Sequence, residues 1–414
     1  MAKSVTITAL DIGTGKVTCA IAELAKDGEL EVVAKGIAPC RGMKNGALIN
    51  SSDTVASVEE AINEAEKSGY QAGEVIIGLT SDFITSRLGR GRTAIAGSSR
   101  EVTEADIDIA IENSTLVGLP SDMEIFKSIP RRFSVDGLGG VTHPVGMSGE
   151  SLEAETYICA ASSAYIRNMR RIIDSAGYDI HKDGMIPSAM ASGLAVLADE
   201  ERSLGQAVLD IGCGTSDLSI FSDGEIGFTE VCSFGGADLA RALACKFNIS
   251  ESEAERLIIE DGAASPDFID DGDKELEAKS LAGDVSITLR KRELAEVMER
   301  ELSELLYWTA QKIFYARRDL GLNVPGIILT GGTAQLSGLD AMIKRDVELT
   351  ATLRSPMFPH NLPEDMTSPI FSTVVGLLLY GAATSQFSAA SAGRDTWARR
   401  WFLKLSGMLK KVGE

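Results

Sequence analysis

The stretch AVLDIGCGTSDLSIF, from Ala207 to Phe221, indicates how the chain folds. Its apolar start is typical of a strand that is covered on both faces, and the glycines that follow predict a turn into a second strand. Asp210 interrupts the apolar run, although a buried carboxylate is unfavourable by several kcal/mol unless a partner compensates it. Glycines let successive backbone N–H groups converge on an anion, and an Asp beside a phosphate group favours a Mg²⁺ ion. The stretch therefore predicts a site for phosphate and metal.

The stretch TITALDIGTGKV, from Thr6 to Val17, repeats this pattern near the N-terminus. Each copy reads as a strand, an Asp-Ile-Gly-x-Gly turn, a strand, an Asp-Gly turn and a further strand, and Asp-Gly turns fit tight hairpins. One such turn is weak support, because Asp and Gly are ordinary turn residues, and a plain turn stays an alternative for either copy alone. Two copies with matching flanks favour a duplicated nucleotide-binding lobe.

The composition excludes several classes of protein. A chain of 414 residues allows two or more domains, and 44% hydrophobic with 24% charged residues is typical of a soluble globular protein. The formal net charge of −20 argues against broad nucleic-acid binding. Six cysteines without a C-x-x-C pair and three histidines make a zinc site or a disulfide framework unexpected, and they favour a reducing cytoplasm. We expect neither a signal peptide nor a membrane-spanning helix, because no apolar run approaches ~20 residues.

Further segments surround the two copies. Residues 81–162 contain Gly- and Arg-rich strand patterns and one helix pattern, which predict a small inserted α+β subdomain. The stretch GIILTGGTA, from Gly326 to Ala334, predicts a third glycine turn between a strand and a helix, and Gly235-Gly236 predict another. We also expect a helix of small residues at 188–197 and a loop at 263–283. A long helix is expected at 291–320, and a further helix at 372–380 should close the globular part. The small-residue helix permits close approach of a neighbour, or reflects tight packing only.

The C-terminal residues change in character. Residues 383–396 are small and polar, like a linker. On a helix, the apolar side chains of 397–414 share one face at spacings of three and four, and basic residues reverse the acidic charge of the body. This composition is typical of a helix lying in the plane of a membrane surface, although a terminal helix docked on the body stays an alternative. The candidate membrane residues are Trp397, Arg400, Trp401, Phe402, Lys404, Leu405, Leu409 and Lys410.

With these residues the chain resembles the actin-like ATPase superfamily and, within it, the FtsA family of bacterial cell-division proteins. The superfamily carries two phosphate turns and one adenosine turn, which match the turns at Asp11, Asp210 and Thr330. Stretches more specific to the FtsA family are RGM at 41–43, PVGMSG at 144–149 and FSTVVGLL at 371–378. The resemblance covers essentially the whole chain.

The resemblance implies an α/β fold, namely an actin-like (ribonuclease H-like) duplicated two-lobe ATPase fold. An inserted α+β subdomain and a C-terminal amphipathic helix would complete it. The implied boundaries are 1–80 with 163–202 for subdomain 1A, 81–162 for the inserted subdomain 1C, 203–232 with 302–382 for 2A, 233–301 for 2B, 383–396 for the linker and 397–414 for the helix.

The resemblance also implies a function. Family members bind ATP, polymerise into actin-like filaments and tether the FtsZ ring to the inner face of the cytoplasmic membrane, and they help recruit later divisome membrane proteins. Expected partners are therefore the FtsZ C-terminal peptide, further copies of this chain, an anionic membrane surface and later divisome proteins, but no nucleic acid. Two alternatives share the fold. A metabolite kinase would need a catalytic Asp in a substrate cleft, and none stands out; a pilus-assembly adaptor should lack the amphipathic tail.

The nucleotide site implied by the resemblance contains ATP and Mg²⁺. Asp11 and Asp210 would hold the metal, mostly through water, because nearby carboxylates repel one another unless a cation lies between them. The expected nucleotide-binding residues are Asp11, Gly13, Thr14, Gly15, Lys16, Asp210, Gly212, Gly214, Thr215, Gly236, Glu255, Gly331, Gly332 and Thr333.

Two positions depart from the pattern of the superfamily. Ile186 precedes Pro187 where some hydrolysing relatives have Glu. Ile cannot orient an attacking water, so we expect no catalytic residue and slow hydrolysis. Ile258 follows Glu255 at the spacing where many relatives place a Lys near the adenosine, which changes the contacts expected from that helix.

A basic cluster is the candidate site for the FtsZ peptide, which in this family is mixed acidic and apolar and binds the subdomain at about 234–301. The cluster consists of Arg290, Lys291, Arg292 and Arg300. A solvated end of the long helix is the alternative interpretation of these residues.

Overall fold

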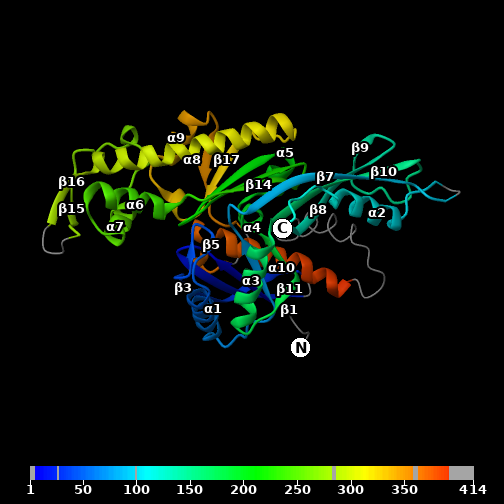
Figure 1. The fold of residues 1–414 in the computed structure, drawn as a ribbon, viewed down its shortest axis with the longest axis horizontal. Coiled ribbons are helices and arrows are strands. Elements are labelled where there is room, and N and C mark those ends of the chain that lie inside the picture. The colour runs from blue at the N-terminus through cyan, green and yellow to red at the C-terminus, as the bar shows by residue number, and fades with distance from the viewer. Residues whose placement is uncertain (1–4, 26–27, 98–99, 282–285, 358–361, 391–414) are drawn as a thin grey trace.

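A computed structural model gives the structure of the protein, and it describes residues 5–25, 28–97, 100–281, 286–357 and 362–390. Two five-stranded sheets form the centres of two lobes (Figure 1). The strands of the first sheet are β1 Val5–Ile12, β2 Lys16–Leu24, β3 Leu30–Pro39, β6 Val75–Leu79 and β11 Ile180–Pro187. Those of the second are β12 Gln206–Ile211, β13 Ser216–Ser222, β14 Glu225–Cys232, β17 Gly326–Thr330 and β18 Thr350–Leu353.

The two sheets have the same topology. The first has the order β11-β6-β1-β2-β3 and the second the order β18-β17-β12-β13-β14. In each, three strands form an antiparallel meander, and two parallel strands follow on the other side of the first strand. The central strands β6 and β17 are buried at every position, as expected of strands covered on both faces. The duplication expected from the sequence is therefore present in the fold, and the α/β actin-like prediction is confirmed by the comparisons reported below.

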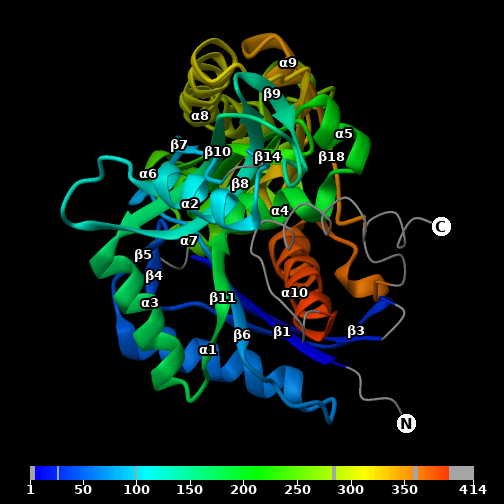
Figure 2. The same cartoon turned by 90° about the vertical axis from the view of Figure 1, so that its right-hand side faces the viewer.

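Helices cover both faces of the first sheet and fill the space between the lobes. These are α1 Ser51–Glu66, α3 Ser163–Ser175, α4 Ser188–Val196 and α10 Ser372–Ala390. Figure 2 shows α1 and α3 on one side of the first sheet and α10 on the other. A Cβ at Gly376 of α10 would lie only 1.7 Å from the carbonyl oxygen of Ala191 in α4. The small residues of α4 thus permit very close approach of a neighbouring helix.

The inserted segment forms its own four-stranded sheet with one helix. Its elements are β7 Ile84–Ala94, α2 Glu104–Thr115, β8 Met123–Val135, β9 Leu138–Val141 and β10 Ser151–Ser162, in the sheet order β7-β10-β8-β9. Ile107, Phe133 and Leu152 belong to a core of its own. The first and last strands are neighbours, and Ile84 pairs with Ala161. The segment therefore leaves the first lobe and returns to it at one place.

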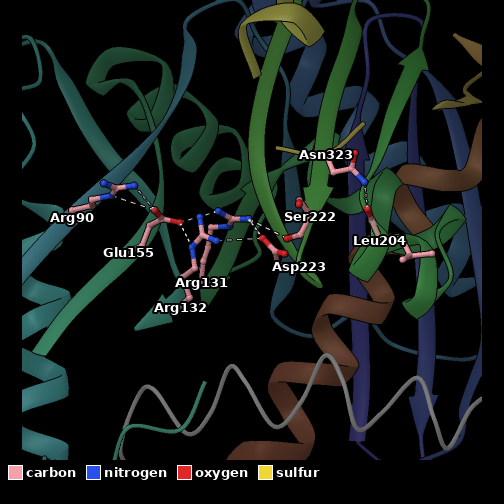
Figure 3. A network of polar contacts seen from close by, with 8 residues as sticks. All are labelled: Arg90, Arg131, Arg132, Glu155, Leu204, Ser222, Asp223 and Asn323. Atoms are coloured by element: carbon pink, nitrogen blue, oxygen red, sulfur yellow. Dashed lines mark hydrogen bonds and ion pairs between the residues drawn. The ribbon is translucent and has the colours of Figure 1, made fainter. Parts of the chain in front are cut away.

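Side chains bind the inserted segment to the second lobe, although the chain connects it to the first. Arg131 of β8 forms an ion pair with Glu155 of β10 at 3.0 Å and donates to the carbonyl oxygen of Ser222 at 3.0 Å (Figure 3). Ser86 Oγ donates to the carbonyl oxygen of Thr229 in β14 at 2.6 Å. The insertion thus spans both lobes.

The remaining elements lie mostly in the second lobe and its extension at the left of Figure 1. They are β4 Met43–Lys44, β5 Ala47–Leu48, α5 Asp199–Leu204, α6 Gly236–Phe247, α7 Glu251–Asp261, β15 Glu275–Lys279, β16 Ser286–Arg290, α8 Lys291–Asp319 and α9 Leu339–Asp346. Short 3₁₀ helices lie at Pro266–Phe268, Thr333–Gln335, Glu364–Met366 and Pro369–Phe371.

Two expectations from the sequence are wrong. The acidic stretch 263–283 was expected to be a loop, but it contains β15, in which Leu276 and Ala278 are buried between exposed charged residues. The linker expected at 383–396 does not begin at 383, because α10 continues to Ala390. Alanine has the highest intrinsic helix propensity, and a helix already anchored by burial extends readily into such residues.

The rest of the expected linker, 391–396, and the expected membrane helix, 397–414, lie outside the described residues. Within the part of the chain that the structure describes, no helix is both long and apolar enough to cross a membrane. The division into four subdomains stays a prediction.

Candidate functional site

The first glycine turn connects β1 to β2. The backbone N–H of Gly13 donates to the carbonyl oxygen of Lys16 at 3.0 Å, which closes the turn directly after Asp11 and Ile12. A Cβ on Gly13 would lie 3.1 Å from that oxygen. The side chain of Lys16 crosses to the segment before the last helix, where Nζ donates to the carbonyl oxygen of Ile370 at 3.1 Å. This turn therefore carries a carboxylate at one end and a cation at the other.

The second glycine turn connects β12 to β13 with the same backbone. The N–H of Gly212 donates to the carbonyl oxygen of Thr215 at 2.9 Å, and a Cβ on Gly212 would lie 3.2 Å from that oxygen. Asp210 occupies the place that Asp11 has in the first turn. Its carboxylate accepts a hydrogen bond from Thr373 Oγ1 of α10 at 3.0 Å.

The two turns contact each other across the boundary between the lobes. A Cβ on Gly214 would lie 2.6 Å from Thr14 Oγ1, and a Cβ on Gly15 would lie 2.9 Å from Cys213 Sγ. The backbone N–H of Gly46 donates to Thr14 Oγ1 at 3.2 Å and steadies the first turn. A side chain at either contact position would crowd the opposite turn, more severely at Gly214 than at Gly15.

The third glycine turn follows β17 and lies beside the second. Gly331 has φ +91°, and a Cβ there would lie 2.3 Å from Asp210 Oδ1. Thr333 Oγ1 donates to the carbonyl oxygen of Gly212 at 2.8 Å. The N–H of Gly236 donates to the same oxygen at 3.0 Å. Three separate glycine turns therefore meet at one point between the lobes.

A cavity of about 300 Å³ lies among these turns. Twelve of the fourteen nucleotide-binding residues expected from the sequence line it, and the two that do not are Gly236 and Glu255. Gly236 lies just behind the lining, since a Cβ there would meet Thr333 Oγ1 at 2.6 Å. Burial raises the pKa of the Cys213 thiol, and the charge of Glu255 raises it further, so Glu255 lies within electrostatic range of the cavity lining. Twelve of the expected residues therefore surround one cavity, and Gly236 and Glu255 lie outside its lining.

The two expected metal ligands face the cavity with perturbed acidities. Burial raises the pKa of Asp11 to about 6, with Lys16 opposing this and Asp210 adding to it. Burial raises the pKa of Asp210 to about 6 as well, with the hydroxyl of Thr373 opposing it. Burial also lowers the pKa of Lys16, while the two carboxylates raise it. Two enclosed carboxylates with raised pKa values would be stabilised in their charged form by a cation.

A third carboxylate, Asp217 of β13, lines the same cavity and was not among the expected residues. It is 5% exposed, and Thr80 Oγ1 lies 2.8 and 2.9 Å from its two oxygens. Burial, followed by the charge of Asp210, raises its pKa to about 8. A signal is present in the sequence: Asp217 lies two residues after Thr215, and side chains two residues apart on an extended chain face the same side.

Further lining residues come from strand ends and from the segment before α10. They are Thr80, Ser188, Cys213, Pro369, Ile370 and Thr373. Thr80 and Ser188 follow β6 and β11 at the carboxyl ends of the parallel strands of the first sheet, where ligands of α/β folds commonly bind. Ile186 is fully buried and does not line the cavity. Among the described residues, no group of three or more His, Cys, Asp and Glu side chains is placed to hold a metal by itself.

The basic cluster expected to bind a peptide is only partly available. Lys291 forms an ion pair with Asp271 at 2.8 Å, and Arg300 forms one with Glu301 at 2.9 Å. Arg290 and Arg292 form no ion pair within the described residues. The expected membrane residues at 397–410 lie outside the described part of the chain.

Solved structures with this architecture identify the class of fold. The PilM–PilN type IV pilus biogenesis complex matches with a TM-score of 0.64 and 16% identity, covering 91% of this chain and 99% of that one. MreB5 of Spiroplasma citri bound to AMPPNP matches with a TM-score of 0.57 and 12% identity, covering 94% and 99%. The duplicated sheets with glycine turns between them are therefore those of the actin-like ATPase fold.

Sequence comparisons identify the family. The family model described as "Cell division protein FtsA" matches residues 207–376, and the one described as "SHS2 domain inserted in FTSA" matches residues 83–160. The FtsA protein of Pseudomonas aeruginosa is 32% identical over 91% of this chain and 89% of its own length. The FtsA protein of Escherichia coli (strain K12) is 28% identical over 98% and 97%. The chain belongs to the FtsA family of cell-division proteins.

The resemblance noted in the sequence is thereby confirmed, together with the actin-like fold and a role in cell division. The metabolite kinase and the pilus-assembly adaptor are less well supported, because the likeness to the pilus complex extends to the fold alone.

Proposed function

We propose that this protein binds ATP with Mg²⁺ between its lobes, assembles into actin-like filaments and tethers the FtsZ ring to the inner face of the cytoplasmic membrane at the division site. In that position it helps recruit later divisome membrane proteins. Closure of the lobes around nucleotide would set the contacts with further copies and with partners, as in other two-state switches.

The observation that carries the nucleotide proposal is the meeting of two glycine turns beside three enclosed carboxylates. The backbone N–H groups of Thr14, Gly15, Cys213 and Gly214 donate no hydrogen bond to the described part of the chain. Free N–H groups in successive turn residues suit an anion such as the phosphates of ATP. These residues fit the nucleotide, and Asp11 and Asp210 fit the metal, since a hard divalent cation takes carboxylate oxygens and keeps several waters.

The bound Mg²⁺ would neutralise phosphate charge. Lys16 would add a positive charge from the first lobe, and the glycine turns would hold the phosphates against both lobes at once. Thr80 would keep the Asp217 carboxyl group fixed at the edge of the cavity. With these contacts, nucleotide would favour the closed arrangement of the lobes, because only that arrangement brings both turns to one phosphate chain.

Hydrolysis should be slow. Ile186 provides no carboxylate to orient water, and Asp217, with a pKa raised to about 8, is mostly protonated at neutral pH. A protonated carboxyl group does not accept a proton from an attacking water. Turnover near the ~10 s⁻¹ of an ordinary enzyme would contradict this proposal.

Asp210→Ala tests the nucleotide site. We expect it to abolish Mg²⁺-dependent ATP binding, measured by calorimetry with and without the metal. Asp223→Ala is the matched control, because it removes an exposed Asp of the same lobe that lies outside the cavity. An unchanged affinity in Asp210→Ala would remove the assignment.

The contact with FtsZ is proposed at Arg290, Lys291, Arg292 and Arg300. Since Asp271 and Glu301 already hold two of these side chains, the free charges of Arg290 and Arg292 would contribute most to an acidic peptide. Reversing charge at Lys291 and Arg292 should weaken FtsZ peptide binding and its dependence on salt. If neither changes, the helix end is merely solvated.

The contact with the membrane is proposed for the C-terminal tail. Five basic residues at 397–414 would contribute at most ~1 kcal/mol each near an anionic surface, so the apolar face must contribute much of the rest. Single-copy binding would then be weak, and a polymer would strengthen it by linking many tails. Trp401→Glu, or deletion after Thr396, should release the protein from vesicles while ATP binding stays intact. Membrane binding that persists without the tail would contradict this.

A further inference from the structure

A group of basic side chains lies on the outer surface of the first lobe, where α3 meets β11. We call it the basic face, and it consists of Arg167, Arg170, Arg171 and Lys182. All four side chains are exposed, and none forms an ion pair or hydrogen bond within the described residues. Even Asp174, one turn beyond Arg170, does not reach ion-pair distance. Such a concentration of unmatched positive charge is unexpected in a protein whose net charge is −20.

The basic face borders a cavity of about 170 Å³ between β8, α3 and β11. Lys127, Arg170, His181 and Lys182 line it, together with the single carboxylate of Asp183. Lys127 is only 8% exposed, and its Nζ donates to the hydroxyl of Tyr380. Burial lowers the pKa of Lys127 to about 8, with the charge of Asp183 opposing this, so Lys127 still carries its charge at pH 7. The cavity is therefore surrounded mostly by positive charge.

This arrangement suits a phosphate group. Arginine side chains bind phosphate through paired N–H donors, and lysine adds a point charge. A hollow of this size admits several waters, and hence a phosphate group that replaces them. A carboxylate ligand would find the same charges, but a phosphate uses more of the donors that Arg170 and its neighbours present.

The position of the basic face indicates where such a phosphate would come from. Tyr380 of α10 contacts two residues that line the cavity: its hydroxyl accepts a hydrogen bond from Lys127 Nζ and donates one to the carbonyl oxygen of Asp183 at 3.1 Å. From Tyr380, α10 continues to Ala390, a rise of about 15 Å. Figure 2 shows α3 beside β11 and α10 on the other side of the first sheet, so the link between the cavity and α10 runs through Tyr380. The chain then leads to the segment proposed above to bind the membrane.

We propose that the basic face and its cavity form a second membrane contact, which binds the phosphate of an anionic phospholipid headgroup. This inference rests on the proposed function, because the tail brings this side of the protein to the bilayer. The chain has a net charge of −20 although its tail is basic, so the body would otherwise be repelled by an anionic surface. Contact at two places would also fix the orientation of the body, which a single flexible attachment cannot do.

The test uses the full chain with Arg170→Glu and Lys182→Glu together. Both side chains are exposed, so the fold should be retained, and ATP binding is measured in parallel as a check. Flotation is measured with phosphatidylcholine vesicles that contain no phosphatidylglycerol or about one third of it. Each basic residue near an anionic surface contributes about fivefold in affinity, so we expect a loss of at least tenfold on the anionic vesicles. Binding to phosphatidylcholine alone should not change.

The matched control carries Lys246→Glu and Lys344→Glu. These residues are also exposed and without ion pairs in the described part of the chain, but they lie on α6 and α9 of the second lobe. The control changes the net charge by the same amount. An equal loss in both double variants would overturn the proposal, since it would show an effect of net charge alone.

Deletion after Thr396 separates this inference from the proposed function. If the shortened chain binds vesicles like the full chain, the tail is not the anchor, and the proposed function fails. If the basic-face variant binds like the full chain, the second contact fails, whatever the tail does.

Two soluble probes distinguish other sources of the anion. Glycerol 3-phosphate should compete with anionic vesicles only at high concentration, and an oligoglutamate peptide should not compete through the basic face. Saturable binding of either probe that Arg170→Glu and Lys182→Glu abolish, with unchanged vesicle binding, would overturn the lipid assignment. It would point instead to a soluble phosphate or an acidic peptide.

Discussion

The first and second glycine turns share one backbone but differ in their side chains. Both close with a hydrogen bond from the first glycine, at 3.0 Å in the first turn and 2.9 Å in the second. In register from the Asp of each turn, Thr14 corresponds to Cys213 and Lys16 to Thr215. The first turn therefore presents a cation to the cavity where the second presents a hydroxyl group.

Two positions further on, the difference is larger. Thr18 of β2 is buried among apolar neighbours, whereas the corresponding Asp217 of β13 lines the cavity. The two copies thus share the backbone that faces the proposed phosphate site, but they differ in the charged side chains that face the cavity. Two lysines facing one another across a narrow cleft would repel, as would two additional carboxylates. A division of charge between the lobes avoids both.

Exchanging Lys16 for the residue at the matching position should have the largest effect. We expect Lys16→Thr to lower ATP affinity by about 10- to 100-fold, because a hydrogen bond to a charged group contributes about 1.5–3 kcal/mol. Thr215→Ala should cost less than about tenfold, since it removes a neutral partner. Calorimetry on both variants decides the matter, and equal losses would show that the turns are functionally symmetric.

The contact between the turns should be more sensitive on one side than on the other. A methyl group at Gly214 would meet the branched side chain of Thr14 at 2.6 Å, whereas one at Gly15 would meet the end of Cys213 at 2.9 Å. We expect Gly214→Ala to lower ATP affinity by about tenfold and Gly15→Ala by less, because a single sulfur moves more easily than a branched side chain. A larger loss in Gly15→Ala would reverse this interpretation.

The extra carboxylate of the second lobe should make stability depend on pH. The folded protein holds a proton on Asp217 up to a pKa of about 8, while the unfolded chain releases it near the ordinary pKa of 3.8. The folded state then binds more protons between these values, so the free energy of unfolding should fall as pH rises, by at most about 1.4 kcal/mol per unit. Asp217→Asn should remove this contribution. Denaturant unfolding of both proteins without nucleotide, at pH 5, 7 and 8.5, gives the free energy of unfolding at each pH. The same pH dependence in both proteins would contradict this prediction.

Replacing Cys213 should have the smallest effect. Its backbone N–H, and not its thiol, is the group proposed to face phosphate, so Cys213→Ser should change ATP affinity by less than about twofold. Alkylation of the thiol, by contrast, places bulk at the contact with Gly15 and should block nucleotide binding. The Cys213→Ser variant is the control for that treatment, since it should keep binding ATP after exposure to the reagent.

Much of the fold was predictable because its main signals are local. A carboxylate and two glycines after an apolar run specify a strand and a turn within a few residues, and the second copy supplied the duplication. Because Asp11 and Asp210 hold the same position before the two turns, both line the cavity where the turns meet. Gly331 was recognised for the same reason, because a double glycine directly after a buried strand is a strong signal for a tight turn.

The sequence does not predict features that depend on packing between distant segments. Asp217 lies where the two lobes meet, and Thr80 of the other lobe donates a hydrogen bond to its carboxylate. Glu255 lies outside the cavity lining, and the orientation of α7 depends on packing against other segments that its own sequence does not specify. In the predicted linker, Ala and Ser suggested flexibility, but the buried start of α10 extends the helix through them. The composition of residues 383–390 alone does not show that the preceding helix continues through them.

The adjacent ends of the inserted segment have a consequence for how such proteins diversify. Because Ile84 and Ala161 are paired neighbours, the host lobe bridges the same short distance with or without the insertion. An inserted unit whose ends are adjacent adds little entropic cost of loop closure to the folding of the host lobe. Because the unit has a hydrophobic core of its own, its sequence can change without disturbing the core of the host. What ties it to this particular host is a small set of side chains, such as Ser86 and Arg131. Exchange of one module for another at this junction would then require few changes elsewhere, which makes it a favourable point for recombination.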